Sequence, residues 1–389
     1  MNRALRASRR LSRLTTISLA CVSLASPSIF VENAPHDGSE RVRSDQWHLN
    51  YLRAQDAHAL NRGKGVVVAV PDTGVDPHID LRDNLLPGLD IIPGGRGDGK
   101  KDSNGHGTCM AGLIAAHGRA GGIGALGIAP EAKILPIFDT PANGFGEPDD
   151  LANSIDYATR NDVDIISISA VSSPTEKLQR AISAARAADI VIVAGVGNTP
   201  RDSRVSYPAS AEGVLAVGGI DRSGKHAKVS ATGPELDLVA PAVDIYSTSI
   251  NGKYRKGTGT SDATAIVAGA AALVRSKYPY LPAAEVVHRL TATAVDKGPP
   301  GRDDEYGYGV IDLVAALTAD VPPLGFEGAT VTPPSGATSA AAQPAGDGGD
   351  GGAVVRGWVT LGVIVAAGGG FLVWRRRGRA DDPPPRISR

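Results

Sequence analysis

The stretch GVVVAVPDTGVD, residues 65–76, joins an apolar run to an abrupt polar turn. Residues 65–70 show no polar alternation, which predicts a strand buried on both faces. Similar runs follow at residues 133–138, 163–169, 190–194 and 213–218. Helical patterns lie between these runs, at residues 107–117, 149–160, 175–188 and 262–277. The alternation predicts an α/β domain with a doubly wound, mostly parallel sheet and helices on both faces.

The composition fits a large globular domain and excludes a nucleic-acid-binding protein. The chain has 389 residues, is 42% hydrophobic and carries a formal net charge of -1. It can therefore bury a large core, and it shows no basic stripe of the kind that binds phosphate. The fold class would also permit a dinucleotide-binding domain. That function is excluded because Pro71, Asp72 and Thr73 stand where a G-x-G-x-x-G turn would follow the first strand.

The N-terminal segment is typical of an exported protein. Arginines followed by small and apolar residues predict a signal peptide at residues 1–25. Cys21 leaves a lipoprotein as an alternative, although Ser18 stands where a lipidated cysteine normally has a larger apolar residue. Without this segment only Cys109 remains, so no intramolecular disulfide can form. Residues 26–64 are too short for a folding prodomain, and we expect an extension that packs on the domain.

The C-terminal segment predicts a membrane anchor. After the main domain, residues 65–318, comes a Pro/Gly/Ala-rich linker at residues 319–352. Residues 353–374 are the predicted transmembrane helix: their apolar part, from Gly357 to Trp374, carries tryptophans near both ends and is about long enough to span a bilayer. The arginine-rich tail, residues 375–389, marks the cytoplasmic side. The chain is therefore expected to cross the cell membrane once, with its main domain outside the cell.

Three polar residues lie at the ends of these elements and point to one chemistry. Asp72 follows the first strand, His106 stands between glycines at a helix start, and Ser261 lies in GTGTSDATAIVAG, residues 257–269. Taken singly they could be a turn former, a surface histidine and a helix cap. Together they supply a hydroxyl nucleophile, an imidazole that takes its proton and a carboxylate that orients the imidazole.

The same blocks resemble a known family. DTGVD, NGHGT and GTS-x-A-T-x-x-VAG are similar, in this order, to the signature blocks of the subtilisin-like serine proteases, or subtilases. The resemblance runs over residues 46–318. It implies a subtilisin-like serine endopeptidase that cleaves polypeptides through an acyl-enzyme, with Asp72, His106 and Ser261 as the catalytic triad.

The resemblance also implies the remaining parts of the site. AGVGN, residues 194–198, is similar to the segment that ends in the oxyanion-hole asparagine, which would make Asn198 an oxyanion donor. The segment from Ser167 onward matches the substrate-binding strand. Four residues are expected to bind the substrate: Ser169, Ala170 and Val171 on that strand, and Gly144 on the opposite edge.

A narrower resemblance concerns the ends of the chain. QWHL at residues 46–49, the predicted anchor behind its linker and the basic tail together resemble the mycosins. Mycosins are membrane-anchored subtilases associated with type VII secretion in actinobacteria. The resemblance implies secretion-complex components as partners. Mycosins commonly carry disulfides, which this chain cannot form internally. The alternative function is a weakly active or non-catalytic scaffold subunit of such a complex.

Some residues depart from the subtilase pattern. Asp262 follows Ser261 where an apolar residue is usual, and it could stabilise the helix start or set specificity on the leaving-group side. Val171 stands where glycine is usual and could narrow the specificity pocket. No cofactor is expected. Calcium remains a possibility, but the carboxylates that could serve it match no ligand motif; they are Asp76, Asp80 and Asp102.

Overall fold

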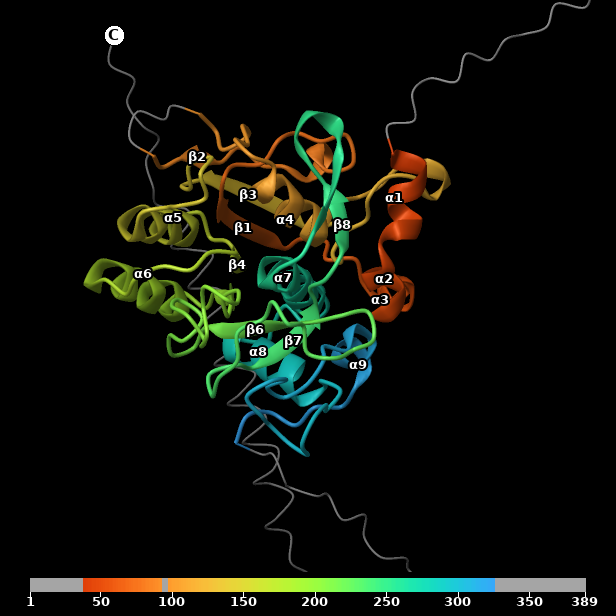
Figure 1. Ribbon diagram of the computed structural model, residues 1–389, viewed down its shortest axis with the longest axis vertical. Helices are drawn as coiled ribbons and strands as arrows, with labels where there is room; N and C mark the ends of the chain where they lie inside the picture. The colour runs from red at the N-terminus through yellow and green to blue at the C-terminus, as the bar shows by residue number, and fades with distance from the viewer. Residues whose placement is uncertain (1–37, 93–96, 326–389) are drawn as a thin grey trace, which may run out of the picture. The chain divides into compact units, whose positions relative to one another are not determined.

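A computed structural model describes residues 38–92 and 97–325 of the chain (Figure 1). The predicted signal peptide, membrane helix and basic tail lie outside the described residues, as does most of the predicted linker. Among the helices of the described ranges, none combines the length and the apolar composition that crossing a bilayer requires.

The described residues contain a parallel sheet at their centre. It is seven-stranded, in the order β2-β3-β1-β4-β5-β6-β7, and all its strand pairs are parallel. The strands are β1 (Val67–Asp72), β2 (Leu89–Asp90), β3 (Lys133–Phe138), β4 (Ile165–Ile168), β5 (Val191–Gly195), β6 (Leu215–Ile220) and β7 (Leu238–Pro241). The predicted buried strands are confirmed, with ends shifted by a residue or two. The short edge strands β2 and β7 were not predicted.

Helices cover both faces of the sheet, which confirms the predicted doubly wound architecture (Figure 1). Side chains of β1 alternate between two cores: Val68 and Val70 face one, and Ala69 faces the other. The first core is closed by α4 (His106–Ala115), α7 (Thr260–Lys277), α8 (Ala283–Ala292) and α9 (Leu313–Thr318). The second is closed by α5 (Pro148–Arg160) and α6 (Glu176–Ala187). Strands buried on both sides explain the absence of polar alternation in the sequence.

The N-terminal helices and a hairpin pack beside the first core. The helices are α1 (Ser39–Asp45), α2 (Trp47–Tyr51) and α3 (Ala54–Leu60), and the antiparallel hairpin is β8 (Ile245–Thr248) with β9 (Tyr254–Gly257). Single turns of 3-10 helix lie at Arg82–Asn84, Ala120–Gly122 and Ile250–Gly252. Leu49 and Ala57 join the main core, and the Gln46 amide donates to the backbone oxygens of Leu126 and Tyr246. The described part of the N-terminal extension thus packs on the domain.

The strand order locates a crevice. In the sheet, β3 and β2 lie on one side of β1, and β4, the next strand in the chain, pairs with the other edge of β1. At such a switch point the loops leave in opposite directions and open a crevice at the carboxyl ends of the strands. Asp72 ends β1, Ser169 follows β4 and Asn198 comes shortly after β5, so all three reach this edge.

Candidate active site

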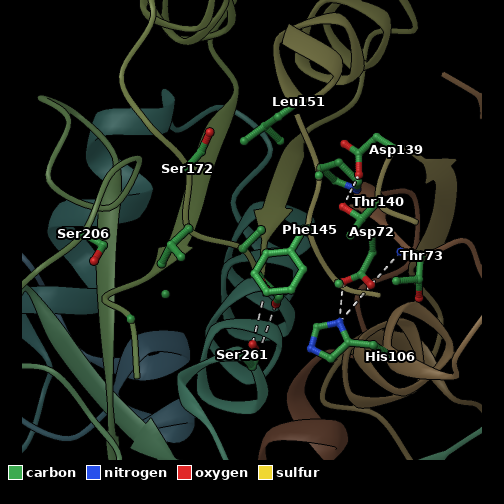
Figure 2. A pocket seen from close by; sticks show the side chains of 18 of the residues that line it. Asp72, Thr73, His106, Asp139, Thr140, Phe145, Leu151, Ser172, Ser206 and Ser261 are labelled. Carbon is green, nitrogen blue, oxygen red and sulfur yellow. Dashed lines mark hydrogen bonds and ion pairs between the residues drawn. The ribbon is translucent and has the colours of Figure 1, made fainter. Parts of the chain in front are cut away.

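A cleft of about 760 Å³ opens at this edge of the sheet (Figure 2). Every site residue predicted from the sequence lines it: Asp72, His106, Ser261, Asn198, Ser169, Ala170, Val171 and Gly144. These residues come from segments far apart in the chain, and the parallel sheet brings them together. Phe145, whose side chain is 70% exposed, stands at the cleft beside Gly144.

Asp72 and His106 are directly bonded. Nδ1 of His106 lies 2.8 Å from Oδ1 and 2.9 Å from Oδ2 of Asp72, and the Asp72 carboxylate is buried. An ionised carboxylate can only accept hydrogen bonds, so the proton of the neutral imidazole resides on Nδ1. Nε2 is then unprotonated and available as a base. The arrangement matches the tautomer that a proton-accepting histidine needs.

The pKa of His106 is raised above its usual value. Burial alone would lower this pKa, but the charge of Asp72 and its hydrogen bonds outweigh burial, and Asp262 adds to the increase. The position of His106 at the N-terminus of α4 disfavours protonation, yet the adjacent carboxylate dominates.

We expect this pKa to set the acid limit of activity. Only neutral imidazole can accept a proton, so kcat/KM for a peptide substrate should fall as pH drops through a value above about 6.5, the usual histidine pKa. Asp72→Asn should lower the rate, and it should also lower the pH at which kcat/KM falls to half, because it removes the charge that favours the imidazolium. The measurement is kcat/KM from pH 5 to 9. If kcat/KM of the wild type fell to half only below pH 6, the expectation would be contradicted.

Two residues that sequence reasoning missed position His106. Thr73 Oγ1 donates to Asp102 Oδ1 at 2.7 Å and accepts from the backbone N–H of Gly107 at 3.1 Å, which ties the end of β1 to the start of α4. Asp102 also accepts from the backbone N–H groups of Gly105 and Thr108. A Cβ at position 107 would lie 2.1 Å from the backbone oxygen of Gly74, so only glycine permits this approach. In the sequence, the signal for these two residues was their place in the motifs D-T-G, which contains Thr73, and D-x-N-G-H-G, which begins with Asp102.

Ser261 lies in the first turn of α7, at the floor of the cleft. Its Oγ donates to the backbone oxygen of Ser169 at 3.3 Å, and Ser169 Oγ donates to the backbone oxygen of Ser261 at 3.2 Å. Figure 2 shows these contacts together with the Asp72–His106 pair. The described residues show no hydrogen bond between Ser261 and His106. Hydrogen bonds between a nucleophile and its base are often loose before substrate binds.

Asn198 is oriented by the residue before Ser261. Its Oδ1 accepts from the Thr260 backbone N–H at 3.0 Å, and its own backbone N–H donates to Asp202 at 2.9 Å. Because the amide oxygen is occupied in this way, the NH₂ group is free to face the cleft, close to the start of α7. A donor there is suited to an oxygen that develops negative charge beside Ser261.

Asp262 is buried instead of standing on the helix surface, with 3% of its area exposed. The Cys109 Sγ lies 4.0 Å from its Oδ1, and a Cβ at Gly257 would lie 2.9 Å from both carboxylate oxygens. Burial raises the pKa of Asp262 to about 7, partly offset by His106 and Arg255. Burial and the Asp262 charge together raise the pKa of Cys109. Asp262 therefore adds a second carboxyl group near the imidazole.

The buried Asp262 should make folding stability pH-dependent. Its pKa is higher in the folded state than in the unfolded chain, so it stabilises the fold at low pH, and this contribution is lost as pH rises from about 4 to 7. In a Ser261→Ala background that prevents self-cleavage, Asp262→Asn should gain about 2–3 kcal/mol of unfolding free energy relative to its parent between pH 5 and 7. Denaturant unfolding at each pH measures this. The control is Asp149→Asn, which replaces an exposed acid in the first turn of α5. If the unfolding free energies of both variants changed with pH in the same way, the raised pKa assigned to Asp262 would be contradicted.

The carboxylates considered for calcium have protein partners. Asp80 pairs with Arg119 Nε at 2.8 Å and accepts from the Tyr254 hydroxyl at 2.6 Å. Asp76 accepts a hydrogen bond from the backbone N–H of Asn251. Asp102 accepts a hydrogen bond from the backbone N–H of Thr108, in the first turn of α4. Within residues 38–92 and 97–325, no group of three or more His, Cys, Asp or Glu side chains is arranged to hold a metal ion.

Comparisons with known proteins show which family this chain is similar to. A family model described as the subtilase family matches residues 63–309. A thermostable alkaline protease of Halalkalibacterium halodurans is 39% identical over 269 residues, which cover 68% of this chain and 71% of the relative. Subtilisin Savinase of Lederbergia lenta is 37% identical over 279 residues, 71% of this chain and 99% of the relative.

Solved structures give a similar result. The crystal structure of MycP1 from Mycobacterium smegmatis aligns with a TM-score of 0.64 and 31% identity, covering 71% of this chain and 85% of that one. A further MycP1 structure aligns with a TM-score of 0.63 and 32% identity, covering 70% of this chain and 88% of that one. That MycP1 is described as a serine protease and an essential component of the type VII (ESX-1) secretion system.

Proposed function

Because this chain belongs to the subtilase family of serine proteases, we propose that Asp72, His106 and Ser261 are its catalytic triad. The observation that carries the proposal is the direct Asp72–His106 bond in a cleft that Ser261 also lines. The bond leaves Nε2 of His106 as the free base, which is the atom a serine hydroxyl must meet.

The reaction follows from these positions. Ser261 Oγ attacks the scissile carbonyl while His106 Nε2 takes its proton, and Asp72 stabilises the imidazolium. The Asn198 NH₂ and the Ser261 backbone N–H donate to the oxyanion of the tetrahedral intermediate. His106 then protonates the leaving amine, and the acyl-enzyme remains on Ser261. Water, deprotonated by the same histidine, hydrolyses the acyl-enzyme and restores the site. These steps assign no cofactor.

The substrate lies in the cleft as an extended peptide. Ser169, Ala170 and Val171 continue from the end of β4 and offer backbone groups for strand-like pairing with the residues before the scissile bond. Gly144 and Phe145 form the facing edge. The branched side chain of Val171 narrows this part of the cleft and favours small residues there.

We further propose that the protease works outside the cell membrane. The signal-peptide features of residues 1–25 and the apolar run at residues 353–374 support an exported protein with one membrane anchor and a cytoplasmic tail. The similarity to MycP1 supports a role linked to type VII secretion. Polypeptides are the substrates, and secretion-complex components are the partners.

A truncation tests the anchor. A variant that ends at residue 352 retains the signal features and the protease domain but lacks the apolar run, so it should appear in the culture medium, whereas the full chain should sediment with membranes. The matched control removes only residues 378–389 and should remain with the membranes. If the variant ending at residue 352 also stayed with the membranes, the anchor assignment would be wrong.

The alternative is a weakly active or non-catalytic scaffold subunit. The buried Asp262 and the missing Ser261–His106 bond favour it. The two functions separate in a deletion strain that is complemented with the Ser261→Ala protein. Restored secretion would assign the essential role to the scaffold, and failed secretion with normal protein levels would assign it to proteolysis.

A further inference from the structure

The hairpin that leads to Ser261 carries an arginine directed toward the active site. In the β8–β9 register, Arg255 stands opposite Ser247, so their side chains share one face of the hairpin. Ser247 Oγ donates to the backbone oxygen of Cys109 at 2.9 Å and Thr248 Oγ1 donates to that of Thr108 at 2.7 Å, so the hairpin packs on α4. Arg255 belongs to this hairpin, beside the helix that begins with His106, and it lines the same cleft as His106.

The neighbouring Lys256 is a natural comparison because adjacent strand residues point to opposite faces. Lys256 pairs with Asp244 at 3.1 Å and lies over the Tyr246 ring, away from the cleft. The other arginine that lines the cleft, Arg201, pairs with Asp202 at 3.4 Å. No hydrogen bond or ion pair from the part of the chain that the structure describes satisfies the Arg255 guanidinium.

The position of Arg255 identifies the part of the substrate that it meets. Residues before the scissile bond run along Ser169–Val171. His106 must protonate the leaving amine, so residues after the scissile bond lie on the His106 side of the cleft. Arg255 lies on this side, since it lines the cleft and its hairpin packs on α4, the helix that begins with His106. The Asp262 carboxyl is buried and forms no ion pair with Arg255, which leaves the guanidinium available to a ligand.

We propose that Arg255 is a specificity-determining residue that binds a carboxylate on the leaving-group side of the scissile bond. This inference rests on the proposed triad, which defines that side. The ligand is the side chain of Asp or Glu at the first or second residue after the cleaved bond, or the terminal carboxylate of a short peptide that ends there. The planar guanidinium can hold such a group through two hydrogen bonds. The chain is then a protease that prefers acidic leaving segments.

The test uses internally quenched peptides with one common sequence before the scissile bond and the purified full-length protein. The first or second residue after the bond is Glu in one set and Gln in the other, with amidated C-termini. We expect kcat/KM about tenfold higher for the Glu peptides at low salt, falling as ionic strength rises. A third set ends in a free carboxylate two residues after the bond and separates terminal recognition from side-chain recognition.

The variants assign the preference to one residue. Arg255→Ala should bring the Glu-to-Gln ratio to about one, and Arg255→Glu should favour Lys at the same position. Lys256→Ala should keep the wild-type ratio. A p-nitroanilide has no residue after the scissile bond, so its hydrolysis by the wild-type protein reports on the triad alone. If the wild type cleaves the anilide but cleaves the Glu, Gln and free-acid peptides at equal rates, the inference is overturned. If it does not cleave the anilide, the result counts against the proposed triad.

Discussion

Replacing Ser261 by alanine is expected to abolish peptide cleavage, with kcat lowered by about 10⁴–10⁶-fold. The reason is the loss of the hydroxyl that is proposed to attack the scissile carbonyl in the cleft that His106 and Asn198 also line. Labelling by a fluorophosphonate should disappear with it, because this reagent reacts with an activated serine hydroxyl. Turnover of a peptide substrate and gel-based labelling measure the two effects.

Ser276→Ala is the matched control for this prediction. Ser276 lies in α7 as well, near the end of the helix remote from the cleft, where its hydroxyl donates to the backbone oxygen of Lys64. This variant should be labelled and should turn over substrate as the wild type does. Unchanged labelling of Ser261→Ala would show that another residue is the nucleophile.

Replacing Asn198 by leucine is expected to reduce kcat by about 10²–10³-fold, equivalent to about 3–4 kcal/mol of transition-state stabilisation. The amide would donate to an oxyanion that exists only after attack, so KM should change little. Steady-state kinetics on a peptide substrate separate the two constants.

Asn198→Asp distinguishes a donor from a structural role. Aspartate keeps an oxygen that can accept from the Thr260 N–H, as Oδ1 of Asn198 does at 3.0 Å, but it lacks the NH₂ group. If Asn198 acts as a donor, this variant should lose kcat as the leucine variant does. Near-normal kcat in Asn198→Asp would mean that the residue only orders the loop before Ser261.

Some features could be predicted because their signal is local. The strands of the parallel sheet are buried on both faces, so each appears as one apolar run. Asp72, His106 and Ser261 sit in short glycine-containing motifs, since a side chain at the end of a strand or the start of a helix needs such a turn to reach the crevice. Those motifs carried the family resemblance, and the residues that they named all line the cleft.

Other features have no local signal. The β8–β9 hairpin is short, and YRKG in β9 shows no apolar alternation, so neither strand was predicted. Asp80 was considered as a calcium ligand, but its partners are Arg119 and the distant Tyr254. Such contacts depend on the distance between segments, which a linear pattern does not contain.

The sequence by itself determined the doubly wound domain and the positions of the residues proposed for catalysis, because burial on both faces and tight turns leave local patterns. Only the tertiary structure decided the environment of those residues. It placed Oδ1 of Asp72 2.8 Å from Nδ1 of His106, and it buried Asp262 beside Cys109. It also turned Arg255 toward the cleft while Lys256 faces away. Burial and electrostatic coupling arise between segments that are distant in the chain, and they exist only once the sheet has brought those segments together.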